Sequence, residues 1–182
     1  MVDLNDFSID DIEQIISEME ISKGKKEEKK DFELLEVYEL LSTTRKTKTV
    51  FSKMRWRNFV RYDLRKWNLD LTIPYKGISF TEDELKQIVS MGPQKIGDEV
   101  RFFYNSDRIQ AHIYNQILKF SEHKEGENLW VKQICIVDWG YGKSFDMRKW
   151  TREYTKCSRG ISLSPKTFVK FYNAIEQIVN SF

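Results

Sequence analysis

The segment WGYGKSFDMRKW, residues 139–150, contains a Gly-Lys-Ser step that matches the last part of a phosphate-binding loop. Such a loop reads G-x-x-x-x-G-K-[ST], because its first glycine lets backbone N–H groups surround the phosphates. The position five residues before Gly142 is Val137, so that first glycine is missing. The sequence therefore predicts a hairpin turn between two strands here rather than a nucleotide site.

No other part of the sequence contains a recognisable motif for catalysis or metal binding. His112 falls in an expected strand and His123 in an expected charged loop, and no serine or cysteine is placed beside either by a known motif. Cys135 and Cys157 are too few for a disulfide framework or a zinc site. The carboxylates lack metal-ligand spacing. We expect a protein that is not an enzyme, with no catalytic residues, no metal and no cofactor.

Composition sets the broad class of the protein. The 182 residues are 40% hydrophobic and 14% aromatic, enough for one medium domain or two small ones. The formal net charge is only +2, so a preference for nucleic acid must come from the distribution of charge. There is no apolar run of 18 residues and no basic start followed by an apolar segment. We expect an intracellular protein, nuclear or cytoplasmic, that does not bind a membrane.

An internal repeat organises the chain. Residues 61–89 align with residues 144–172 at a constant offset of 83, without a gap. The matched positions are Asp63 with Asp146, Arg65 with Arg148, Trp67 with Trp150, Gly77 with Gly160, and Ser79 with Ser162. A repeat of this kind predicts two copies of one supersecondary unit.

Each repeat has the pattern of four strands followed by a helix. The expected strands are rich in β-branched, aromatic and apolar residues; they cover 32–42, 48–56, 60–67 and 76–80, then 108–120, 129–139, 143–150 and 159–164. Thr81 and Ser164 have the positions of helix N-caps, the first followed by three acids and the second by Pro165. The sequence predicts an α+β fold with repeats at 31–92 and 106–182 and a linker at 93–105.

Residues 1–30 differ in kind from the repeats. Residues 8–16 suggest a short amphipathic helix, and the charge run SKGKKEEKK after it is typical of a solvated linker. A helix of this kind is a candidate contact for RNA polymerase or for other transcription or replication proteins.

The faces of the first sheet can be assigned from an expected three-residue turn at residues 57–59. Alternation along the strands then places Met54, Val60, Tyr62 and Leu64 toward the helix, and the other face carries Lys53, Arg55, Arg61, Asp63, Arg65 and Trp67. Between Arg45 and Lys66 there are nine Lys or Arg and one acid. Cations that follow phosphates and rings that stack on bases suit single-stranded nucleic acid, although an ordinary solvated sheet face fits the same pattern.

The motif D-[LM]-R-K-W, a loop, and [KR]-G-I-S-[FL]-[ST] leading into a helix resembles the DNA-binding core of the family of transcriptional coactivator positive cofactor four, including its short bacterial relatives. The resemblance covers about 31–92 and 106–182. It implies binding of single-stranded or melted DNA by a two-fold dimer with little sequence preference. Two units in one chain would then pack as an intramolecular pseudo-dimer.

The resemblance also implies site residues, carried over position by position. The family's strand arginine matches Arg65 and Arg148, and its strand-closing tryptophan matches Trp67 and Trp150. The basic residue before Gly-Ile-Ser matches Lys76 and Arg159, and the turn aromatic matches Trp56 and Trp139. The basic residue after that aromatic matches Arg57, whereas the second unit has Gly140 there. The second unit also carries the basic residue Lys143, but it has no counterpart of Arg57, so we expect the first unit to supply more of the affinity. Charge reversal at Arg55 and Arg65 should therefore weaken binding more than reversal at Lys143 and Arg148.

The expected function is non-enzymatic binding of single-stranded DNA in transcription, replication or repair. Two alternatives stay open. One is a protein-interaction adaptor of the transcription machinery, and the other is an RNA-binding protein, because stacking tolerates either sugar.

Overall fold

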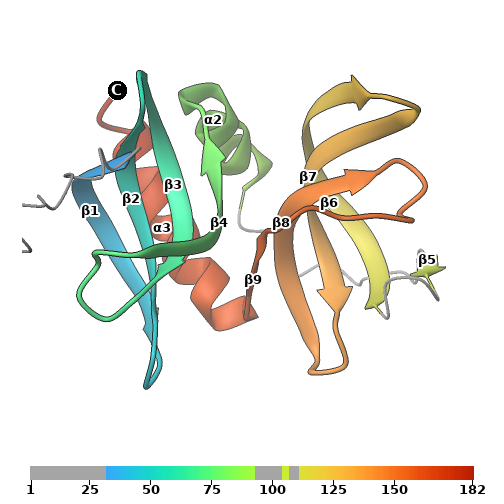
Figure 1. Ribbon diagram of the computed structural model, residues 1–182, viewed down its shortest axis with the longest axis horizontal. Coiled ribbons are helices and arrows are strands. Elements are labelled where there is room, and N and C mark those ends of the chain that lie inside the picture. The colour runs from blue at the N-terminus through green and yellow to red at the C-terminus, as the bar shows by residue number, and fades with distance from the viewer. Residues whose placement is uncertain (1–31, 93–103, 107–110) are drawn as a thin grey trace, which may run out of the picture. The chain divides into compact units, whose positions relative to one another are not determined.

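The computed structural model describes residues 32–92, 104–106 and 111–182 (Figure 1). The expected N-terminal helix, its charged linker and residues 93–103 of the expected central linker lie outside the described residues. Residues 34–182 form one compact unit. That unit is an α+β fold made of two repeats, as the sequence predicts, and each repeat is an antiparallel sheet followed by a helix.

The first repeat forms a four-stranded sheet in the order β1-β2-β3-β4, in which every strand lies beside its neighbour in sequence. Its elements are β1 (Phe32–Thr43), β2 (Lys48–Trp56), β3 (Phe59–Trp67), β4 (Pro74–Phe80) and the helix α2 (Glu82–Met91).

The second repeat forms a five-stranded sheet in the order β5-β6-β7-β8-β9. Its elements are β5 (Tyr104–Ser106), β6 (Ala111–Glu125), β7 (Asn128–Asp138), β8 (Lys143–Thr151), β9 (Ile161–Leu163) and the helix α3 (Pro165–Val179). Strands β6 to β9 are the four that the repeat predicts. The short strand β5 begins in the last two residues of the expected linker and ends at Ser106, the first residue of the expected second repeat. It pairs with the start of β6 from Tyr104 opposite Ile113 to Ser106 opposite Ala111.

Both predicted helix starts are confirmed. Thr81 accepts a hydrogen bond from the backbone N–H of Glu84, and the Glu84 carboxylate accepts one from the N–H of Thr81, which completes a capping box. Ser164 caps α3 by accepting from the N–H of Thr167, and Pro165 occupies the first helical turn. These caps satisfy N–H groups that the helices leave without internal partners.

The two repeats share one hydrophobic core. In Figure 1, α3 of the second repeat runs behind the strands of the first sheet, and its Phe171 meets Phe51 of β2 edge-on with ring centroids 5.0 Å apart. Tyr172 donates a hydrogen bond to the backbone oxygen of Val89 in α2 at 3.1 Å. Leu85 of α2 is fully buried in the same cluster. Each repeat therefore completes the core of the other, which is the packing of an intramolecular pseudo-dimer.

A largely buried ion pair also joins the repeats. The ammonium group of Lys132 in β7 lies 2.6 Å from Glu84 Oε2 and donates to the backbone oxygen of Ser79 at 2.6 Å. Burial lowers the pKa of Lys132, and the hydrogen bond and charge of Glu84 oppose that shift. The carboxylate that caps α2 thus binds a cation of the opposite repeat.

The position of His123 differs from the sequence expectation. It lies in β6 rather than in a loop, because β6 and β7 continue as a long hairpin until Glu125 pairs with Asn128. Gly126, with φ 60°, begins the two-residue turn. The charged run looked like a loop in sequence because both of its faces are exposed to solvent.

The hairpin between β2 and β3 corrects the expected faces of the first sheet. Its turn has two residues, Arg57 and Asn58, since Trp56 pairs with Phe59. Arg57 accommodates the tight turn with φ 51°. A shift of one residue moves side chains of β2 to the opposite face. Lys53 and Arg55 therefore lie on the face toward the helices, and the prediction that they share a face with Arg65 is wrong. Met54, which the sequence places toward the helices, lies on the same face as Arg61 and Arg65.

Two glycines of the repeat are explained by close approach of neighbouring strands. Gly77 lies opposite Arg65, and a Cβ added to it would come 2.5 Å from the backbone oxygen of Leu64 and into contact with Arg65 Cβ. A Cβ added to Gly160 would meet the oxygen of Met147 at 2.5 Å. The repeated Gly-Ile-Ser step is thus required by backbone packing.

We expect Gly77→Ala to lower the free energy of unfolding by about 3 kcal/mol, because the added methyl group must displace strand backbone. Urea unfolding followed by circular dichroism measures this loss. Gly126→Ala is the control: it has nothing within 4 Å and costs only the left-handed conformation, roughly 1 kcal/mol. Equal losses in the two variants would contradict the packing explanation.

Candidate nucleic-acid interface

The repeated Asp and Arg of the first repeat form a buried ion pair. Asp63 is fully buried, and Arg65 donates to both of its oxygens through Nε and through Nη2, the latter at 2.7 Å. Ser79 donates to Asp63 Oδ2 at 2.6 Å. The remaining nitrogen of Arg65 donates to the backbone oxygen of Tyr75 at 3.1 Å, which ties β3 to the start of β4. A bidentate pair of this kind fixes both side chains.

The second repeat builds the same network. Asp146 is fully buried, Arg148 donates to its two oxygens at 2.6 Å each, and Ser162 donates to Oδ2 at 2.6 Å. The indole N–H of Trp139 adds a fourth hydrogen bond to Asp146 at 3.3 Å. Burial alone would lower the pKa of Arg148, but the hydrogen bonds and charge of Asp146 outweigh it and the pKa is raised. Arg148 therefore remains charged.

The strand-closing tryptophans are not available for stacking on bases. Trp67 and Trp150 are both fully buried. Trp150 stacks on Trp139 with ring centroids 5.8 Å apart and also contacts Tyr154 at 5.6 Å. The expectation that these two tryptophans are exposed is corrected: alternation assigns a face to a side chain, but it does not reveal what covers that face.

The turn aromatics Trp56 and Trp139 lie against the arginines of the network. Both rings are half-buried, and the guanidinium carbons of Arg65 and Arg148 lie 4.6 Å and 4.5 Å from their centroids. Cation–π contacts of this geometry hold the guanidinium planes in place. Predicted site residues thus take part in a packed network in both repeats, Arg65 and Trp56 in the first and Arg148, Trp139 and Trp150 in the second, which accounts for their repetition without a ligand.

Three exposed arginines of the first repeat lie around the tip of the β2–β3 hairpin. Arg55, Arg57 and Arg61 are exposed there, and Phe59 beside them is 64% exposed. The Arg61 guanidinium lies 5.6 Å from the centre of the Phe59 ring. The sequence from Arg45 to Tyr62 contains no acid. The tip therefore offers an accessible aromatic ring within a positive field.

Sequence reasoning missed Phe59. The sequence places this residue in the expected turn 57–59, whereas it is the first residue of β3 and pairs with Trp56. An aromatic residue flanked by Arg57 and Arg61 was the available signal.

The corresponding tip of the second repeat has less positive charge. Tyr141 is 97% exposed, so a ring is present there too. Lys143 is exposed nearby, with its ammonium 4.6 Å from the centre of the Tyr114 ring. Asp138 places a carboxylate at this tip, where it accepts the N–H groups of Gly140 and Gly142 at 2.7 and 3.0 Å. The two tips are unequal in charge, in the direction that the sequence predicts.

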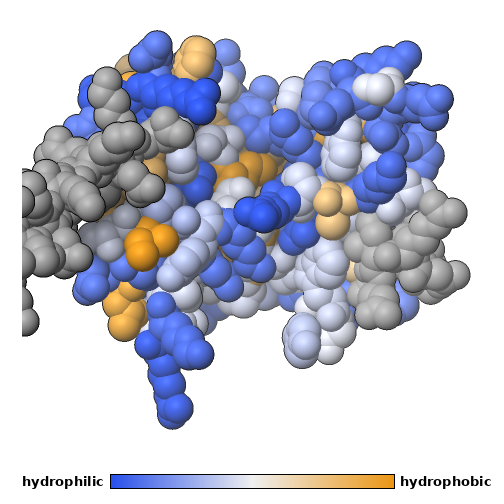
Figure 2. Space-filling model, in the orientation of Figure 1, coloured by the Kyte–Doolittle hydropathy of each residue, from blue (hydrophilic) through white to orange (hydrophobic). Residues whose placement is uncertain are grey.

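Lys76 and Arg159, the basic residues before the two Gly-Ile-Ser steps, are exposed. The pKa of Lys76 is lowered, first by partial burial and then by the positive charges of Lys66 and Arg148. Lys76 precedes Gly77, which lines a hollow formed by both repeats, so Lys76 lies near their junction. Figure 2 shows hydrophilic side chains over the β1–β2 hairpin, and Arg45 and Lys46 are exposed in its turn.

The residues that the structure describes offer no group of three or more His, Cys, Asp or Glu side chains that could hold a metal ion. Within the same residues, none of the helices has the length and apolar character needed to cross a membrane.

We expect Asp63→Asn to lower the free energy of unfolding by about 3–5 kcal/mol, because the Arg65 guanidinium would be left largely buried without its carboxylate. Urea unfolding is the measurement. Asp70→Asn, in the exposed β3–β4 loop, removes the same charge and should change stability by less than about 0.5 kcal/mol. A similar small change in both variants would show that the pair does not stabilise the sheet.

The accessible cations and rings thus lie at the hairpin tips and at the junction of the repeats, and the repeated motif residues lie beneath them. Comparisons of the chain with protein-family models, with curated proteins and with solved structures found no match.

Proposed function

We propose that this protein binds single-stranded nucleic acid with little sequence preference, and that its natural ligand is single-stranded or melted DNA in transcription, replication or repair. The observation that carries the proposal is the tip of the β2–β3 hairpin. There the exposed ring of Phe59 lies beside Arg61 on one face of the hairpin, next to the exposed Arg57 of the turn.

The chemistry of this tip suits a flexible, charged polymer. Guanidinium groups at Arg57 and Arg61 neutralise phosphates beside the ring, and a ring as exposed as Phe59 can stack on any base. Arg55 adds positive charge from the opposite face of the hairpin. A duplex hides the faces of its bases, so stacking of this kind favours a single strand. Sequence preference should be weak, since stacking is available to all four bases.

The second tip supplies a weaker contact of the same type. Tyr141 offers a ring, but Asp138 offsets the charge of Lys143. We infer that the first repeat contributes more of the affinity. The resemblance of the two repeats to the positive cofactor four family supports DNA as the ligand and transcription as the process. The surface itself has no feature that selects DNA over RNA.

A protein-interaction adaptor is the second candidate, and the β3–β4 loop supports it. Asn68 accepts hydrogen bonds from the N–H groups of Thr72 and Ile73 at 2.8 and 2.9 Å, which orders the loop. Leu69 and Ile73 are nevertheless 40% and 54% exposed. Apolar side chains presented from an ordered loop are typical of a protein contact. This alternative predicts no binding of single strands by the wild-type chain at low salt.

We expect Phe59→Ala to weaken binding of a labelled 20-nucleotide single strand by roughly 5- to 150-fold, the loss of about 1–3 kcal/mol of stacking. Fluorescence anisotropy across a salt series measures it, with duplex DNA and single-stranded RNA of the same length in parallel. Tyr141→Ala should cost less, because fewer cations surround Tyr141.

The matched control for that measurement is Phe182→Ala. Phe182 is 49% exposed and contacts Tyr62, with ring centroids 5.9 Å apart, on the face of the first sheet opposite to Phe59. Its removal should leave the affinity unchanged. If Phe59→Ala and Phe182→Ala bind alike, the hairpin tip is not the binding surface.

A further inference from the structure

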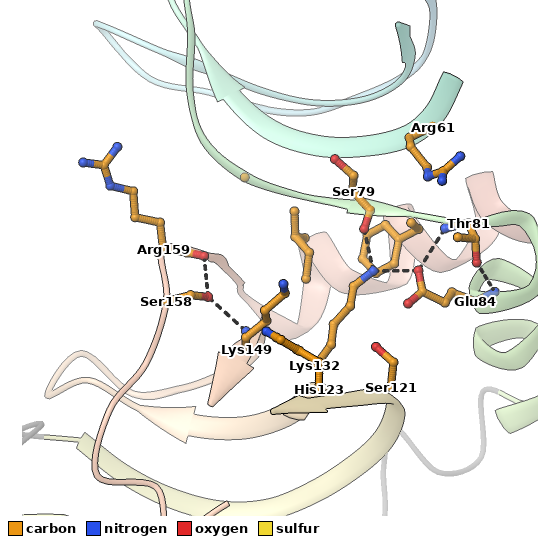
Figure 3. A pocket seen from close by; sticks show the side chains of 13 residues that line it. Arg61, Ser79, Thr81, Glu84, Ser121, His123, Lys132, Lys149, Ser158 and Arg159 are labelled. Carbon is orange, nitrogen blue, oxygen red and sulfur yellow. Dashed lines mark hydrogen bonds and ion pairs between the residues drawn. The ribbon is translucent and has the colours of Figure 1, made fainter. Parts of the chain in front are cut away.

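A pocket of about 540 Å³ lies between the repeats. One side comes from β3, β4 and the start of α2, and the other from β6, β7, β8 and the loop before β9 (Figure 3). Its volume is typical of pockets that hold a small molecule or part of a larger one. The pocket exists only because the repeats pack together, so neither repeat contains it alone.

The lining is strongly cationic. Arg61, Lys132, Lys149 and Arg159 contribute four positive side chains, and Glu84 is the single acid among the lining residues. That acid is neutralised, because Lys132 lies 2.6 Å from its Oε2. The charges of Lys149 and Arg61 both lower the pKa of Lys132, after the larger effect of burial. Three cations therefore act on one another across the pocket, an arrangement that an anion would stabilise.

Lys149 and Arg159 are the cations best placed to bind an added ligand. Both are exposed, and neither side chain forms an ion pair with any residue that the structure describes. Ser158 fixes their spacing: its hydroxyl accepts the N–H of Lys149 at 3.1 Å and donates to the backbone oxygen of Arg159 at 3.0 Å. Figure 3 shows Lys149 beside Lys132, with Arg61 and Arg159 toward the margins.

The other lining groups indicate which part of a nucleotide would fit. Ser121 and Thr81 line the pocket from different repeats, and the Thr81 hydroxyl also caps α2. Of the two aromatic rings among the lining residues, Phe80 is fully buried and covered by Lys132, whose ammonium is 4.9 Å from its centre, and His123 is exposed. Cations and hydroxyls bind phosphate and sugar, and the four cations of the lining outnumber its one accessible ring.

We propose that this inter-repeat pocket holds a phosphate of the bound strand, so that the strand passes from the β2–β3 hairpin across the junction of the repeats. The inference rests on the proposed function, and it extends the path of the nucleic acid from the β2–β3 hairpin into the inter-repeat pocket. Arg61 carries the connection, since it contacts Phe59 at the hairpin and also lines the pocket. The polynucleotide backbone lies in the pocket and its bases point outward, where Phe59 can stack on one of them.

The test is a salt series of single-strand binding by the double variant Lys149→Gln/Arg159→Gln. Each phosphate contact to a single strand contributes about 0.7 to the slope of log affinity against log salt. Loss of two contacts should reduce the slope by about 1.4 and weaken binding roughly 25-fold at 0.1 M salt. The control Lys166→Gln/Lys170→Gln removes two exposed charges from α3, outside the pocket, and should keep the wild-type slope.

The outcomes separate the two proposals. If the wild-type chain binds no single strand, the proposed function fails, and the path proposed here fails with it. If it binds and both double variants show the same slope, the pocket proposal alone is wrong. A third arm titrates inorganic pyrophosphate by calorimetry. Heat of binding that requires Lys149 and Arg159, with an unchanged strand slope in their absence, would identify a site for a free phosphate compound and overturn the strand path.

Discussion

Each sheet is organised around one carboxylate that has been removed from water. An isolated buried carboxylate is very costly, so Asp63 and Asp146 must be surrounded by donors. A bidentate arginine and a serine meet that requirement in both repeats. The strand that carries the arginine lies so close to its neighbour that only glycine fits opposite the arginine. The turn tryptophan covers the plane of the guanidinium group. The residues that the two repeats share are therefore those that surround the buried carboxylates of Asp63 and Asp146.

This constraint leaves the middle of the sheets unsuited to the binding that we propose. Arg65, Arg148, Trp67 and Trp150 are occupied by packing and by ion pairs, so they cannot also serve a polymer that arrives from solvent. The side chains that remain accessible differ between the repeats: arginines and Phe59 at one tip, Asp138 and Tyr141 at the other. The repeats share residues where packing constrains them, and their residues differ where side chains are exposed to solvent. Identity between repeats is consequently a guide to structure here, and divergence is a guide to function.

Local patterns predicted the order and type of the elements well, because caps and strand composition act over a few residues: Thr81 and Ser164 cap the helices as predicted, and four strands precede each helix, although β6 runs on to Glu125. The faces of β2 were not predictable with the same certainty. A turn of two residues instead of three changes little in composition, yet it moves Lys53 and Arg55 across the sheet. The inter-repeat pocket could not be predicted at all. It joins Arg61 and Ser79 to Lys132 and Arg159, and no local pattern relates residues so far apart in sequence.

The shared core has a consequence for how the two halves can change. In a dimer of identical chains, every substitution occurs twice, and the halves separate on dilution. Here α3 packs on the opposite sheet within one chain, through Phe171 on Phe51, so association of the halves is intramolecular and independent of protein concentration. A substitution alters one half only. Fusion thus frees each hairpin to acquire its own residues, and it gives the molecule a direction that a symmetric pair lacks.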